Sequence, residues 1–206
     1  MDSSDSAGGP RPLEYWLQDL ERRRAFVKPE HTVRGMFFRG MLESFRALGD
    51  EALVRRCLEA CGQARFQDFS TYSAEIQFQI ILTALPFLTR HHGSAEAALH
   101  EIGRWGVVDF LGSVPGRAML MLTQGRPRPL IDHLPAAYRV VVNFGESQVV
   151  WNGAQQGMFL IRSTILPPPF HVGVLAGLFE AARTSVPHVS GRATGALDVA
   201  CDFSWE

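Results

Sequence analysis

The stretch LDVACDFSW (residues 197–205) decides the fold class of this chain. Large apolar side chains stand at every second position of it, and small or acidic residues stand between them. Successive side chains of a strand point to opposite faces, so this alternation predicts a half-buried antiparallel strand. Asp198 and Asp202 fall on its polar face, where a solvated strand surface is favoured over a working carboxylate pair.

The residues before this strand predict the rest of a small sheet. Residues 186–193 are expected to form its hairpin partner, and residues 170–185 a helix in which Gly173 and Gly177 allow a close approach to the sheet. Three more strands are expected over 138–144, 148–151 and 158–166, because these runs are rich in β-branched and aromatic residues and are separated by turn signals. The expected order of this ending is β-β-β-α-β-β.

Residues 13–134 show the other periodicity. Apolar residues recur there at spacings of three and four, which indicates amphipathic helices. Ser94 and Ser113 each precede such a segment as N-cap residues, and Pro86 is expected to kink or shorten the helix that contains it. The sequence therefore predicts an α+β fold in which a helical N-terminal half packs on an antiparallel sheet.

The length of 206 residues suits one domain with small additions. Residues 1–12 are polar and rich in glycine and proline, so a disordered tail is expected there. Residues 13–33 are expected to hold an N-terminal helix that ends in the basic run 22–24 and packs on its own domain or on a second subunit, as a docking or dimer element. A single α+β domain is expected over 34–206.

Composition restricts the partners and the compartment. The net charge of −1, from 20 basic and 21 acidic residues, argues against a nucleic-acid binder or a strongly basic membrane-surface protein. No run approaches the roughly 20 apolar residues of a membrane span. The start of the chain lacks the pattern of a signal peptide, and three cysteines suit reduced thiols. A cytoplasmic protein is therefore expected.

No motif in the sequence predicts catalysis. The nucleophile motif Gly-x-Ser-x-Gly is absent, and the one lysine, Lys28, is not part of a phosphate-binding loop. Cys57 and Cys61 have a spacing that can hold a metal, but no second ligand pair accompanies them, so buried core thiols are favoured. We therefore expect no catalytic residue, no metal ligand and no enzymatic activity.

Short landmarks from residue 34 to residue 205 carry a family resemblance. They are Met36-Phe37-Phe38, Ala84-Leu85-Pro86, Glu101-Ile102-Gly103, Pro115-Gly116-Arg117 and Asp202-Phe203-Ser204-Trp205. With these landmarks the chain resembles a family of paralogous proteins of unknown function expanded in myxobacteria, the domain-of-unknown-function family 2378.

The order of elements also resembles, more distantly, two groups of ligand-binding domains. These are the heme nitric oxide/oxygen-binding domains and the vinyl reductase-like small-molecule-binding domains. In the heme-binding group a histidine on the helix before the sheet binds the iron, and His133 lies near that place in this sequence. That group also holds the heme propionates with a Tyr-x-Ser-x-Arg motif, whereas the corresponding strand here reads FLIRS (159–163). Without this motif the buried propionates of a heme would lack hydrogen-bond donors, which argues against heme binding. The sequence does not identify a cofactor.

Two functions of different classes follow. The first is a non-enzymatic cytoplasmic sensor or regulatory module that binds a small apolar ligand between its helices and its sheet. The residues expected at such a site are Phe78, Leu82, Phe110, Met119, Met121 and His133. The residue types by themselves favour a filled core over a pocket. The alternative is a ligand-free protein-interaction or scaffold module, and a heme-based gas sensor is the weaker third. A protein partner or a homodimer is expected in either case.

Overall fold

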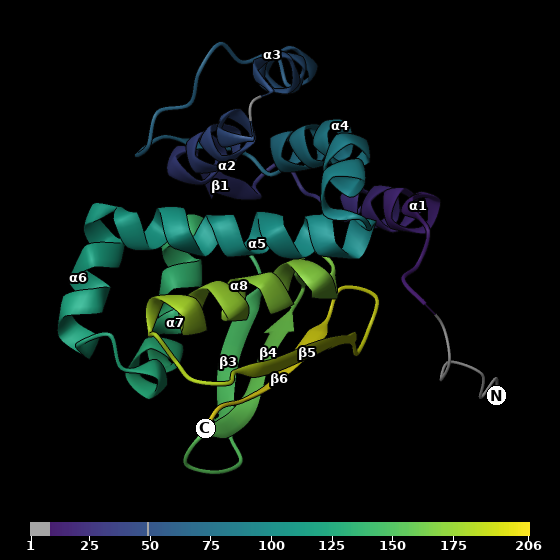
Figure 1. The fold of residues 1–206 in the computed structure, drawn as a ribbon. Helices are drawn as coiled ribbons and strands as arrows, with labels where there is room; N and C mark the ends of the chain where they lie inside the picture. The colour runs from purple at the N-terminus through teal and green to yellow at the C-terminus, as the bar shows by residue number, and fades with distance from the viewer. Residues whose placement is uncertain (1–8, 49) are drawn as a thin grey trace.

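The computed structural model describes residues 9–48 and 50–206, and it confirms the α+β class (Figure 1). Residues 1–8 of the expected tail lie outside the described part. The helices are α1 Leu13–Arg24, α2 Gly35–Ala47, α3 Glu51–Ala60, α4 Glu75–His92, α5 Ala95–Gly112, α6 Val114–Thr123, α7 Pro127–Val141 and α8 Pro168–Ala181. The strands are β1 Thr32–Arg34, β2 Thr71–Ser73, β3 Glu146–Trp151, β4 Gln156–Arg162, β5 His188–Ala193 and β6 Val199–Ser204.

The four longer strands form one antiparallel sheet in the order β3-β4-β6-β5. The last strand, β6, lies in the interior of the sheet, and its Cys201 pairs with Phe159 of β4 and with Gly191 of β5. Val199 and Phe203 are buried on the same face as Cys201, while Asp202 is partly exposed on the other. The alternation in LDVACDFSW is therefore confirmed as a strand, and Ala200 is the one residue of its other face that is buried as well.

Helix α8 lies between the sheet and the long helix α5 (Figure 1). A Cβ atom at Gly173 would collide with the carbonyl oxygen of His100 on α5, and one at Gly103 of α5 would collide with the carbonyl oxygen of Phe170 on α8. The close approach that Gly173 and Gly177 permit is therefore to α5, where Gly177 faces Arg104, and not to the sheet as the sequence suggested. The two helices approach each other closely because glycines stand on both.

The strand expected over 138–144 is wrong. Residues 138–141 form the last turn of α7, which runs through Pro135, and the ending is β-β-α-β-β with two strands before α8. Leu130, Ile131, Leu134 and Ala137 recur at helical spacing and are buried, so tertiary packing outweighs the β-branched run that follows them. The strand expected over 158–166 also ends early, at residue 162, and a buried loop follows.

The N-terminal half forms a layer of helices over α5 (Figure 1). Ser94 and Ser113 cap α5 and α6 as expected, because their hydroxyls accept hydrogen bonds from the amides of Ala97 and Gly116 at 3.1 and 3.3 Å. Pro86 lies inside α4, which continues past it to residue 92. No helix in residues 9–48 or 50–206 is long and apolar enough to cross a membrane.

Helix α1 packs on its own domain. Its Trp16 and Leu20 are buried, and it contacts α4 and α5. This is one of the two arrangements that the sequence left open for residues 13–33. A role of the same helix in a dimer stays a prediction.

Candidate ligand-binding cavity

A cavity of about 670 Å³ lies among α5, α6, α7, α8 and the loop after β4. Its walls are mainly aliphatic and aromatic, as in most small-molecule sites. The apolar lining residues include Phe37, Val107, Phe110, Leu111, Met119, Leu134, Ala137, Val141, Ile161, Ile165, Leu166, Phe170, Val174 and Leu178. The cavity reaches the surface at the turn between α7 and β3, where the exposed residues Arg139, Asn143 and Glu146 line it.

Of the six residues that the sequence singled out, Phe110 and Met119 line this cavity. Phe78 is fully buried in the core, and Leu82 packs against that core from the same helix, α4, but neither belongs to the lining.

The other two residues of the predicted site point away from the cavity. Met121 is 80 % exposed on the outer face of α6. His133 is exposed on α7, where its Nδ1 atom lies 2.8 Å from the carbonyl oxygen of Pro129, so this histidine serves its own helix. Adjacent helical positions differ by about 100° in direction, and sequence spacing alone did not fix which of them faces inward.

Gln77, next to Phe78 on α4, is a lining residue that the sequence analysis missed. Its side chain is buried, with 2 % exposure, and its Oε1 atom has no hydrogen-bond partner. A buried polar atom without a partner costs free energy and is rare in folded proteins. Gln77 is therefore a lining residue that carries an unpaired hydrogen-bond acceptor.

His171 in the first turn of α8 is the second missed residue. It is 1 % exposed, its Nδ1 atom lies 2.8 Å from the Tyr138 hydroxyl on α7, and its Nε2 atom lies 2.9 Å from the Thr164 hydroxyl in the loop after β4. Burial, together with the nearby charge of Arg23, lowers the pKa of His171 to about 3, so its ring is neutral at physiological pH. Burial also raises the pKa of the Tyr138 hydroxyl well above 10.

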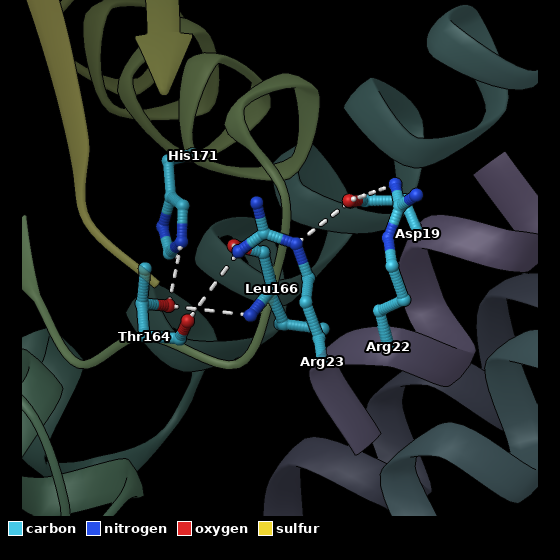
Figure 2. A network of polar contacts seen from close by, with 6 residues as sticks. All are labelled: Asp19, Arg22, Arg23, Thr164, Leu166 and His171. Carbon is cyan, nitrogen blue, oxygen red and sulfur yellow. Dashed lines mark hydrogen bonds and ion pairs between the residues drawn. The ribbon is translucent and has the colours of Figure 1, made fainter. Parts of the chain in front are cut away.

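Behind this part of the cavity wall lies the network drawn in Figure 2. Arg23 of α1 is 4 % exposed and forms an ion pair of 2.7 Å with Asp19. The same guanidinium donates to the carbonyl oxygens of Thr164 and Leu166 at 3.5 and 3.2 Å (Figure 2). A buried charge needs this full set of partners, and the set fastens the loop that lines the cavity to helix α1.

The sequence contains a signal for the burial of His171 but none for its contact with Tyr138. His171 is the one polar residue in the run PPPFHVGVLAGLF (167–179), and a polar group inside such a run is buried with a partner more often than not. His188, the other histidine that flanks α8, is exposed on β5. Nothing in the sequence pairs Tyr138 with His171, because they come from different helices.

The cysteines are not arranged as a site. Cys57 is buried against α4, and burial raises the pKa of its thiol to about 12, as it does for Cys201 in the sheet. Cys61 is partly exposed. Within the part of the chain that the structure describes, no three metal-ligating side chains lie together.

Comparison with solved structures shows the fold of H-NOX proteins. The Fe(II) unliganded H-NOX protein from K. algicida has a TM-score of 0.66 and 14 % identity, over 84 % of this chain and 96 % of that one. An H-NOX protein from S. oneidensis in the Fe(II)NO ligation state has a TM-score of 0.64 and 10 % identity, over 84 % and 99 % of the two chains. At such identities the likeness shows the fold alone, and it confirms the expected similarity in architecture. The likeness to vinyl reductase-like domains stays a prediction.

No curated protein matches the sequence. A family model does, and it covers all of the domain from the residues that follow α1 to the end of the sheet. Its description is "Protein of unknown function (DUF2378)", and it matches residues 27–206. The chain therefore belongs to the DUF2378 family, as the short landmarks of the sequence indicated.

Proposed function

We propose that this protein is a ligand-binding sensor or regulatory module that holds a small apolar molecule in the cavity between α5, α6, α7 and α8. The observation that carries the proposal is the cavity itself, about 670 Å³ in volume with a mainly apolar wall. Ligand sites commonly enclose about 300–1,000 Å³, so this space suits a molecule of metabolite size. Moving the apolar surface of a ligand from water into this cavity contributes roughly 25 cal/mol of binding free energy for each Å² buried.

A heme, the group that the resemblance to H-NOX domains implies, does not fit the residues of this cavity. The expected iron ligand, His133, is exposed and lies outside the lining. His171 does line the cavity, but both of its ring nitrogens are engaged with hydroxyl groups. For two buried propionates the lining offers the guanidinium of Arg139, which lies at the exposed end together with Glu146. We therefore expect the protein not to shift or sharpen the Soret band of added hemin.

One observation favours the second candidate, a protein-interaction module. Helix α6 carries three large apolar side chains in solvent, Val114, Met121 and Leu122. Such a patch is typical of a contact with another protein. This candidate needs no ligand, and it predicts an oligomer or a bound partner when the protein is purified.

The proposal is tested by measuring how the purified protein binds a fluorescent apolar dye, N-phenyl-1-naphthylamine. Val107→Phe fills part of the cavity and is expected to abolish dye binding, whereas Val108→Phe, the same change at the neighbouring exposed position, leaves it intact. A mass spectrum of an organic extract then searches for a co-purified molecule. Equal dye binding by the two variants, with no molecule in the extract, would overturn the proposal.

A further inference from the structure

The buried polar side chains of the cavity wall differ in whether they already have a hydrogen-bond partner. The hydroxyls of Tyr138 and Thr164 each hydrogen-bond to a ring nitrogen of His171, and the backbone amide of Leu166 also donates to the Thr164 hydroxyl at 3.3 Å. These groups are satisfied without a ligand. Gln77 is the contrasting case, since its Oε1 atom is buried in the same wall with no partner. A ligand that donates a hydrogen bond to this atom would remove the cost of burying it alone.

The interior of the cavity also carries no charge. Tyr138 and His171 are neutral there, and the ionised side chains of the lining, Arg139 and Glu146, stand at the exposed end with opposite signs. An ionised ligand group placed deep in this space would lose its hydration and find no counter-charge. The buried part of a ligand must therefore be neutral.

On the basis of the proposed function, we infer that the cavity selects an uncharged apolar molecule with one hydroxyl or N–H group, which donates a hydrogen bond to Oε1 of Gln77. The apolar body of the ligand contacts the aliphatic and aromatic walls. Its donor gives the specificity, because a ligand with a donor relieves the cost of the unpartnered acceptor, whereas a ligand without a donor leaves that cost unchanged.

The experiment uses three probes of equal chain length, 1-decanol, decyl methyl ether and decanoate, each in competition with the apolar dye at neutral pH. The ether keeps an acceptor oxygen but loses the donor, and decanoate adds a charge. We expect the wild-type protein to bind decanol about tenfold more tightly than the ether, the scale of one buried hydrogen bond, and to bind decanoate more weakly than decanol.

The test variant is Gln77→Met, which keeps the length of the side chain and removes its amide. It is expected to bind the ether as the wild type does and to lose the preference for decanol. Gln79→Met is the matched control on the same helix, because Gln79 is outside the lining, and it should keep that preference. Gln77→Met should also unfold at the same or a higher temperature, since the variant no longer buries an unpaired oxygen.

The possible results distinguish a failure of this inference from a failure of the proposed function. If Gln77→Met binds the dye and still prefers decanol to the ether, the inference is overturned while the cavity remains a ligand site. The inference is likewise overturned if the wild-type protein binds decanol and the ether equally. If no probe displaces the dye, or the dye does not bind, the proposed function fails and the inference fails with it.

Discussion

The Nδ1 atom of His171 lies 2.8 Å from the hydroxyl oxygen of Tyr138, and this contact joins helix α8 to helix α7 across the wall of the cavity. His171 lies in a predicted helix, whereas Tyr138 was expected in a strand, and their meeting depends on the packing of α7 and α8. The contact gives the cavity wall a polar seam, held together by groups that are neutral at physiological pH.

Tyr138→Phe should destabilise the domain. The change leaves a ring nitrogen of His171 buried without its hydroxyl partner, at a cost of about 1–3 kcal/mol in the free energy of unfolding. Urea unfolding followed by circular dichroism measures this cost. Tyr15→Phe, at a half-buried position on α1, is the control and should change the stability by less than about 0.5 kcal/mol. Equal stabilities of the two variants would show that the contact contributes nothing.

Stability should fall in mild acid because of His171. Its pKa is about 3 in the folded protein and 6.5 as a free side chain, so the unfolded state binds the proton more readily and gains population as the pH falls below 6.5. From pH 7 to pH 4.5 this costs the folded state about 2–3 kcal/mol, since one pKa unit corresponds to about 1.4 kcal/mol.

Asp109 acts in the opposite direction, because burial and the nearby charge of Glu43 raise its pKa to about 6 and the folded state gains stability as that carboxyl is protonated. Comparison with His171→Gln removes this contribution, since Asp109 is present in both proteins. The wild type should lose about 2–3 kcal/mol more than the variant between pH 7 and pH 4.5. Parallel pH profiles of the two proteins would contradict the assignment of His171 as a buried neutral base.

Arg23 should matter far more than its neighbour Arg22. Arg23→Met removes the guanidinium that donates to the carbonyl oxygens of Thr164 and Leu166, and it leaves the Asp19 carboxylate with one of its two arginine partners, so a loss of about 3–5 kcal/mol is expected. Arg22 pairs with the same carboxylate, but its side chain is 62 % exposed, so Arg22→Met should cost no more than about 1 kcal/mol. Thermal unfolding of both variants is the measurement. A small effect of Arg23→Met would mean that α1 does not hold the cavity loop.

The parts of the fold that local patterns describe could be predicted from the sequence. The strand 199–204 followed from its alternation, and the starts of α5 and α6 followed from capping serines. Residues 138–141 were misassigned because their branched side chains favour a strand, while the buried residues one and two turns earlier keep the helix going.

The candidate site was less accessible to sequence reasoning. Phe110 and Met119 were predicted because apolar residues on helices often face a core, and both line the cavity. Gln77 and His171 were missed because their roles depend on what lies opposite them, and no local pattern encodes that. Glycines 173 and 177 were noticed for their size, but only the packing shows that they meet α5.

The position of β6 in the sheet has a consequence for folding during synthesis on the ribosome. β4 and β5 do not touch, and each pairs with β6 along its length. The hairpin of β3 and β4 therefore has an unpaired edge from the time it leaves the exit tunnel until β6 becomes available to pair with it. During that interval the nascent chain exposes backbone donors and acceptors that another strand could capture.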